Sequence, residues 1–322
     1  MKNYIVKVVA FLCGICIIVG ICIFVSPVNQ VSNHIFSVLS NSEDFTRSEE
    51  EAKIKSIADA KNPNNGYTKL LAGDSVCWML FTRLQEYNDD YLIAAASRPF
   101  TIAGQYVVVK EFIENHPDAT DVYLMLSKDD WQAVLDVQCG YQNVAVPIIE
   151  TDTWDDLDAN TKEELQQLFG DFLLRPQVVK TYDYSNMNRK IVLNGVRMYH
   201  EKVLHEDVSA QYEETKDEFS PIAKQYFEKI IQICEENGVT LHLLHDPQAD
   251  TEENHNKLEV EKKMFEEAGY AEIASDYLTK VMWCPEEQFY DGIHFGGTEA
   301  EQDVVIQKYV KFLNEMSDLK LQ

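Results

Sequence analysis

The stretch LLAGDSVCWMLF (residues 70–81) joins two apolar runs through a Gly-Asp-Ser turn. Its first run is short and apolar, which is typical of a buried strand. Asp and Ser commonly stand where helices begin, so the second run predicts a helix that starts near Ser75. Two interpretations of Ser75 follow: it is a nucleophile at a strand end, or it is only the cap of this helix.

The same alternation of strand and helix recurs along the chain. Further strands are predicted at YLIAAAS (91–97), DVYLMLS (121–127) and VTLHLLH (239–245), with helical stretches from residues 104, 221 and 298. Such alternation predicts parallel strands joined by right-handed crossovers. We therefore expect one α/β domain over residues 67–322, a parallel sheet in a three-layer α/β/α arrangement. Residues 128–218 lose the alternation and are interpreted as an insertion or lid.

An uncharged apolar segment, VVAFLCGICIIVGICIFV (8–25), lies near the N-terminus. As a helix it would extend for about 27 Å, close to the thickness of a hydrocarbon core. We interpret residues 1–26 as a cytoplasmic tip and a transmembrane anchor; a cleavable signal peptide is the alternative. Lys2 and Lys7 precede the segment, which puts the N-terminus in the cytoplasm and the rest outside the cell membrane. Residues 27–66 are then an extracytoplasmic stalk.

Charge and cysteine content restrict the function classes. The chain has 322 residues, with 28 Lys and Arg against 54 Asp and Glu, and a net charge of −26. Such an acidic chain is unsuited to nucleic acid, and a neutral, zwitterionic or cationic partner fits it better. Three of the seven cysteines lie in the anchor segment, and the other four allow three pairings or buried single thiols, which their wide spacing favours: Cys77, Cys139, Cys234 and Cys284. We expect no metal and no cofactor.

A serine hydroxyl becomes a good nucleophile when a base takes its proton and an acid orients that base. The stretch QFYDGIHFGG (288–297) supplies both groups as Asp291 and His294. Their spacing lets Asp291 bond one ring nitrogen of His294 while the other faces Ser75. Ser75, His294 and Asp291 are therefore the candidate catalytic residues.

Other residues compete for functional roles. Cys77 is the nearest alternative nucleophile, although CWMLF is typical of a core helix. His242 and His245 suggest a metal site, but residues three apart on a strand face opposite sides. Asp246, in HDP, is expected close to the candidate site, and the four tryptophans could stack on sugar rings or pack in the core.

The GDS turn and the DGIH loop resemble the first and last sequence blocks of the SGNH (GDSL-type) hydrolase superfamily. The anchor and FSPIAKQYFEKIIQICEENGVTLHLLHDP (219–247) are similar to membrane-anchored members associated with D-alanylation or O-acetylation of cell-surface polymers. The resemblance implies an SGNH/flavodoxin-like fold, Ser75 as nucleophile, and Asp291 and His294 as its partners. It also implies an oxyanion hole made by the backbone of Ser75 and by Gly104 in TIAGQY. The chain departs from block three, where LSKDDW (126–131) lacks the usual asparagine donor.

This resemblance implies acyl-ester chemistry through an acyl-serine intermediate, either hydrolysis or acyl transfer. The expected partners are an acylated surface polysaccharide or polymer and an integral-membrane acyltransferase. The alternative is a catalytically weak, membrane-anchored accessory or binding protein for a surface-polymer acylation system, in which Ser75 only caps a helix.

Overall fold

The computed structural model describes residues 49–81, 90–95, 101–134, 148, 151–169 and 217–316, with the single positions 7, 11 and 14. Nearly all of the expected anchor and much of the expected stalk lie outside these residues, as does Cys139. Among the helices in the described ranges, none is both long and apolar enough to cross a membrane. The anchor over residues 1–26 therefore stays a prediction.

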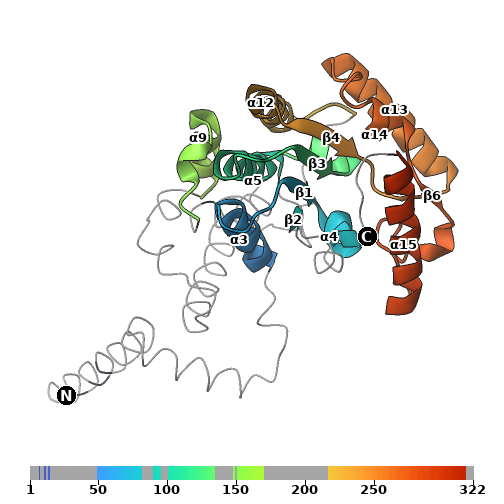
Figure 1. The fold of residues 1–322 in the computed structure, drawn as a ribbon, viewed down its shortest axis with the longest axis horizontal. Helices are drawn as coiled ribbons and strands as arrows, with labels where there is room; N and C mark the ends of the chain where they lie inside the picture. The colour runs from blue at the N-terminus through green and yellow to red at the C-terminus, as the bar shows by residue number, and fades with distance from the viewer. Residues whose placement is uncertain are drawn as a thin grey trace.

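Four parallel strands form the central sheet (Figure 1), in the order β2 (Tyr91–Ala95), β1 (Lys69–Gly73), β3 (Asp121–Met125) and β4 (Thr240–Leu244). The predicted α/β fold with parallel strands is confirmed. Each strand is a nearly continuous apolar run because helices cover both faces of the sheet.

The helices divide between the two faces (Figure 1). Leu70 and Ala72 of β1 belong to one core with α3 (Glu49–Ala60), α5 (Ile102–Asn115) and α12 (Pro221–Asn237). Leu71, which points the other way, belongs to a second core with α4 (Ser75–Phe81) and α15 (Glu299–Met316). The alternation of side chains along each strand thus gives three layers, helix, sheet and helix.

The strand order creates a topological switch point beside β1. After β1 the chain passes through α4 to β2 on one side, and then through α5 to β3 on the other side of β1. Such a switch point leaves open the space beyond the carboxyl ends of the two central strands. The GDS turn lies there, directly after β1.

The structure differs from the sequence interpretation at the expected stalk. Its residues 49–60 form α3, and Ile57 and Ala60 are fully buried in the same core as α5. The many charged residues of this helix suggested a solvated spacer, but its side chains Ile57 and Ala60 pack into the core of the domain. The α/β domain therefore begins before residue 67.

The expected insertion, where described, is helical. It contains α6 (Lys128–Gln132), η4 (Trp154–Asp156) and α9 (Ala159–Phe169), and the Tyr226 hydroxyl donates to Thr161 Oγ1 of α9 at 2.7 Å. After β4, a small parallel pair, β5 (Gln248–Ala249) and β6 (Trp283–Cys284), is connected through α13 (Glu252–Ala268) and α14 (Ser275–Thr279), and η6 (Glu286–Gln288) follows β6.

Candidate active site

The turn after β1 is fixed by Asp74. Its buried carboxylate accepts hydrogen bonds from the backbone N–H groups of Val76 (2.8 Å) and Cys77 (3.2 Å). These are the donors that an N-cap residue satisfies. Asp74 therefore caps α4, and the Ser75 hydroxyl makes a different contact.

Gly73 allows the turn to lie close to β3. A Cβ atom at this position would come within 2.3 Å of the Met125 carbonyl oxygen and 2.5 Å of Cys77 Cβ. Only glycine fits between the neighbouring strand and the first turn of α4.

The Ser75 hydroxyl meets His294 from the far end of the chain. Ser75 Oγ lies 2.8 Å from His294 Nε2, and His294 Nδ1 lies 2.7 Å from Asp291 Oδ2. The second Asp291 oxygen accepts the backbone N–H groups of Ile293 (3.0 Å) and His294 (2.7 Å). The structure thus brings together the three residues in which the sequence predicts a triad, in the order acid, imidazole and hydroxyl.

The Asp291 carboxylate is ionised at neutral pH. Partial burial opposes the charge, but the donors of His294 and Ile293 outweigh it and lower the pKa of Asp291 to about 2. An ionised carboxylate accepts the Nδ1–H of His294 and leaves Nε2 as the acceptor that faces Ser75.

The predicted oxyanion donor Gly104 lies in the first turn of α5, buried. Its neighbour Gln105 donates from Nε2 to the Gly73 carbonyl oxygen at 3.2 Å, so the start of α5 lies against the end of β1. The role of Gly104 remains a prediction. At the position of block three, Asp130 is buried and accepts from the Ser127 N–H at 2.8 Å.

The competing residues make contacts other than those of the Asp291–His294–Ser75 chain. Cys77 is fully buried, and burial together with the charge of Asp74 raises the pKa of its thiol well above the ordinary value, which disfavours the reactive thiolate. His242 pairs with Asp121, whereas His245 lies between Asp246 and Glu261. Over the described part of the chain, no cluster of three or more His, Cys, Asp and Glu side chains is arranged to hold a metal ion.

The tryptophans and cysteines have mixed environments. Trp131 is fully buried among aromatic rings, whereas Trp78, one turn after Ser75, is 38% exposed. Cys234 and Cys284, like Cys77, are buried free thiols. Within the described residues, the cysteines therefore behave as single buried side chains.

Comparison with protein-family models, with curated proteins and with solved structures finds no match. The geometry of the site and the resemblance of its two sequence blocks are therefore the basis for a functional proposal.

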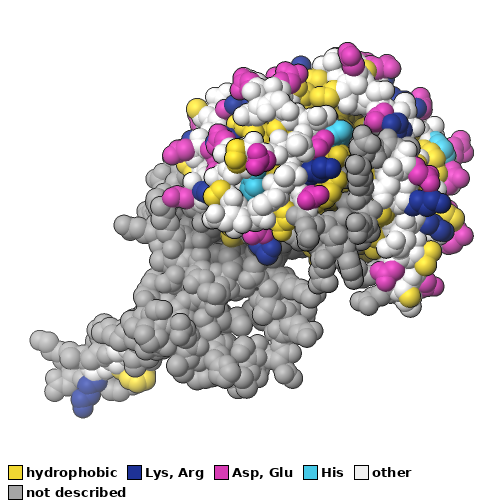
Figure 2. Space-filling view, viewed as in Figure 1, with side chains coloured by type: hydrophobic (Ala, Val, Ile, Leu, Met, Phe, Trp, Pro, Cys, Tyr) yellow, Lys and Arg dark blue, Asp and Glu magenta, His cyan; other side chains and the backbone are white. Residues whose placement is uncertain are grey.

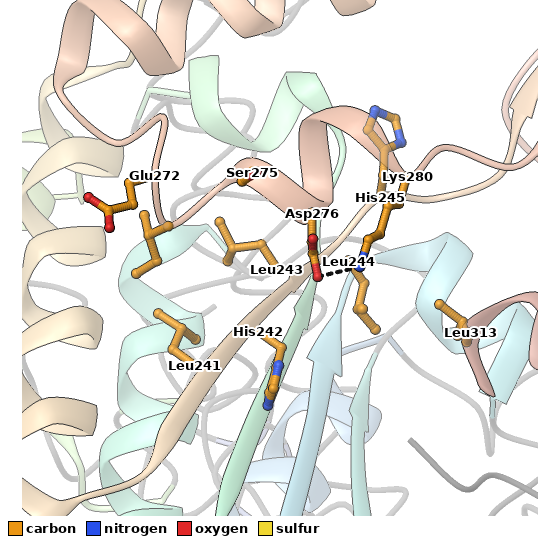
Figure 3. A pocket seen from close by; sticks show the side chains of 11 residues that line it. Leu241, His242, Leu243, Leu244, His245, Glu272, Ser275, Asp276, Lys280 and Leu313 are labelled. Carbon is orange, nitrogen blue, oxygen red and sulfur yellow. Dashed lines mark hydrogen bonds and ion pairs between the residues drawn. The ribbon is translucent and has the colours of Figure 1, made fainter. Parts of the chain in front are cut away.

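A cavity of about 240 Å³ lies away from this site, along β4 (Figure 3). His242, Leu244 and the ion pair between Asp276 and Lys280 (2.7 Å) lie around it. It is lined by neither Ser75 nor His294. We place the candidate site at the strand ends because the acid, base and hydroxyl groups converge there and not in the cavity.

A buried cluster of acids lies beneath the nucleophile turn, and the sequence indicated only part of it. Asp74, Asp130 and Asp246 are all buried; burial and the charge of Asp246 raise the pKa of Asp74 to about 6, and burial and the charge of Asp74 raise the pKa of Asp130. His245 lies with Nδ1 2.9 Å from Asp246 Oδ1 and Nε2 3.3 Å from Glu261 Oε2. The HDP stretch pointed to Asp246, and Asp130 has the Ser-x-x-Asp spacing of the capping box that it forms with Ser127. No local pattern marks Glu261.

Protonated His245 should make the stability of the protein depend on pH. Burial opposes its charge, but Asp246 and Glu261 outweigh burial and raise the pKa of His245 from 6.5 to about 10. The folded protein then keeps a proton that the unfolded chain releases. The free energy of unfolding should fall as the pH rises from 6.5 to about 10, by up to about 1.4 kcal/mol for each pH unit.

Urea denaturation between pH 7 and 8.5 measures this slope. His245→Asn should have a flatter slope than the unsubstituted protein. His255→Asn is the matched control, because His255 also lies against a carboxylate, 2.8 Å from Asp250, but at the surface. Equal slopes for the His245 variant and the unsubstituted protein would contradict the assignment of a buried charge.

Proposed function

We propose that this protein is an SGNH-like serine hydrolase or acyltransferase that acts on acyl esters of a cell-surface glycan or polymer. The observation that carries the proposal is the continuous chain of contacts from Asp291 through His294 to Ser75 Oγ. The parallel sheet, with the nucleophile after its first strand, also supports the SGNH/flavodoxin-like fold that the sequence blocks imply.

In the proposed reaction, His294 Nε2 takes the hydroxyl proton as Ser75 Oγ attacks the acyl carbon. The imidazolium that forms is stabilised by Asp291 and returns the proton to the departing alcohol. Water or a sugar hydroxyl then attacks the acyl-serine, with His294 again as the base. Hydrolysis and transfer differ only in whether water or a sugar hydroxyl takes the acyl group from Ser75.

The oxyanion of each step would be held by the backbone N–H groups of Ser75 and Gly104. The contact between Gln105 and the Gly73 carbonyl oxygen supports this role, since it holds the first turn of α5 against the end of β1. A typical oxyanion donor contributes about 10²- to 10³-fold in rate. With no asparagine in block three, catalysis by this chain is expected to be slow compared with that of an enzyme with three donors.

The surroundings favour a substrate of low negative charge. Acidic side chains are spread over the face shown in Figure 2, in a chain of net charge −26. Beside the triad, Tyr290 is 70% exposed and stacks on His294 with ring centroids 5.8 Å apart. Exposed aromatic and apolar groups at a site are typical of ligand contact surfaces. A neutral acylated glycan at the outer face of the membrane fits these features.

The missing asparagine favours a second candidate function. A membrane-anchored accessory protein could bind an acylated polymer, or assist an integral-membrane acyltransferase, without turning over esters itself. Asp74 already caps α4, so the Ser75 hydroxyl would then have no capping role either.

Labelling with a serine-directed fluorophosphonate distinguishes these candidates. The reagent should add once to the protein by intact mass, with peptide mapping that places the adduct on Ser75, because His294 activates only this hydroxyl. The chain used should retain α3, since Ile57 and Ala60 are part of the core. A folded protein that stays unlabelled would favour the accessory role, and an adduct on Cys77 would redirect the mechanism to a thiol.

A further inference from the structure

The triad loop (residues 289–295), which carries Asp291 and His294, is held as a short hairpin. Its ends, Phe289 and Phe295, face each other in an antiparallel bridge, with ring centroids 4.8 Å apart. Within the hairpin, the N–H of Tyr290 donates to the His294 carbonyl oxygen at 3.0 Å. These contacts fix the backbone at Tyr290, so its ring is held beside His294 although 70% of the residue is exposed.

Exposed apolar side chains gather on the elements that carry the triad. In the described part of the α/β domain, large apolar side chains are exposed at four positions, Trp78, Tyr290, Ile293 and Val304. Trp78 lies one turn after Ser75 on α4, and Tyr290 and Ile293 belong to the triad loop. Exposure of such side chains to water is unfavourable, and their concentration at one site is typical of a surface that contacts a ligand.

The role of His294 decides which part of an ester lies near Tyr290. In the proposed reaction, Nε2 returns a proton to the departing alcohol, so the alcohol oxygen must come within hydrogen-bond reach of this nitrogen. The Tyr290 ring is nearly parallel to the imidazole, with an angle of 21° and centroids 5.8 Å apart. An aromatic ring beside the imidazole neighbours the alcohol, whereas the acyl carbon lies at Ser75 Oγ. In acyl transfer, the accepting hydroxyl gives its proton to the same nitrogen and therefore uses the same space.

We propose that Tyr290 is a specificity-determining residue that stacks on a neutral sugar ring of the alcohol, the departing one in ester cleavage and the accepting one in transfer. The inference rests on the proposed serine chemistry and names the alcohol that it uses. The C–H groups on one face of a sugar ring carry small positive charges, which suit the negative face of an aromatic ring. A neutral sugar fits because Asp291 and the net charge of −26 would repel an anionic one.

Two esters that share the acetyl group and differ in the alcohol test the inference. Glucose pentaacetate offers a neutral sugar ring, and ethyl acetate offers no ring. Tyr290→Ala should raise the KM for glucose pentaacetate about three- to tenfold with little change in kcat, because stacking contributes to binding before and during the reaction. The kcat/KM for ethyl acetate and the rate of fluorophosphonate labelling at Ser75 should stay unchanged. Release of acetate measures both reactions.

Two further substitutions separate stacking from apolar bulk. Tyr290→Phe keeps the aromatic face and should keep the KM for glucose pentaacetate. Tyr290→Leu keeps apolar bulk without an aromatic face and should resemble Tyr290→Ala. Val304→Ala is the matched control, since it removes an exposed apolar side chain from α15, outside the triad loop, and should leave both esters unaffected.

An unchanged KM for glucose pentaacetate in Tyr290→Ala would overturn the inference. Equal losses of kcat/KM for the two esters, together with slower labelling of Ser75, would also overturn it, because they would show that Tyr290 only shields or orients His294. A KM that rises in Tyr290→Phe as much as in Tyr290→Ala would contradict stacking by the ring.

Should the unsubstituted protein not be labelled at Ser75, the proposed function fails, and sugar binding is then tested by itself. Saturation-transfer NMR with glucose pentaacetate and the Ser75→Ala protein should show transfer to the ring protons of the sugar. The double variant that also carries Tyr290→Ala should lose most of this transfer. Equal transfer to the sugar in the two proteins, or none in either, would contradict the role of Tyr290.

Discussion

Ser75→Ala should abolish acyl-ester turnover and fluorophosphonate labelling while the protein stays folded. The proposed reaction has no other nucleophile, since Cys77 is buried and its thiol pKa is raised. Loss of the nucleophile of a triad can cost about 10⁶-fold in kcat. Because Asp74 and not Ser75 caps α4, the free energy of unfolding should change by only about 0.5 kcal/mol, less than the loss of a cap would cost.

His294→Ala should reproduce this loss, because a serine without a base is a weak nucleophile. Asp291→Asn should be equal or milder, since Asp291 orients the base and does not itself take the proton. His255→Ala is the control: it removes a histidine that also lies 2.8 Å from an aspartate, but away from Ser75. Hydrolysis of a small chromogenic ester, and urea denaturation of each variant, provide the two readouts.

Retention of the full acyl-ester turnover by Ser75→Ala would show that Ser75 is not the nucleophile. If all variants and the unsubstituted protein are equally inactive, assays with a membrane fraction that contains the native acceptor should follow. Inactivity there as well would leave the accessory role as the better description.

Gly73→Ala should both destabilise the protein and slow labelling of Ser75. The added Cβ would come within 2.3 Å of the Met125 carbonyl oxygen and 2.5 Å of Cys77 Cβ, far inside van der Waals contact. Both neighbours are fixed, one in the backbone of β3 and the other in the first turn of α4, so neither can rotate away. Overpacking of this kind costs about 1–3 kcal/mol, and we expect the upper part of this range.

The same clash should move the turn that carries Ser75. A displacement of about 1 Å from His294 would lower reactivity by up to about a hundredfold. Gly66→Ala is the matched control, because Gly66 has a φ of 76° but no atom within 4 Å of the added Cβ. It should cost only about 1–2 kcal/mol of backbone strain and leave labelling unchanged. Urea denaturation and labelling rates measure both effects, and a Gly73→Ala protein with unchanged stability and labelling would contradict the close approach.

Local sequence was sufficient to predict the strands and one half of the site. The four apolar runs that predicted strands form β1 to β4, because a strand with both faces covered needs apolar side chains throughout its length. Asp291 and His294 could be paired from their spacing, since a loop of three residues brings their side chains within reach of each other. These features depend only on residues close together in the chain.

Only the tertiary structure decided the features that depend on residues far apart. Ser75 and His294 are 219 positions apart, and they meet because α4 and α15 pack on the same face of the sheet. The charged helix α3 belongs to the domain because Ile57 and Ala60 enter its core, which composition alone could not show.

The identity of the cap and the acid cluster were likewise decided by packing. The sequence suggested Ser75 as the alternative cap of α4, whereas the hydrogen bonds show that Asp74 caps this helix. The strand order places the ends of β1, β3 and β4 side by side, and this gathers Asp74, Asp130 and Asp246 in one buried space. Sequence determined which residue types stand at each strand end. The order of the strands determined which of these residues meet, because contact and burial depend on distance in space and not on distance along the chain.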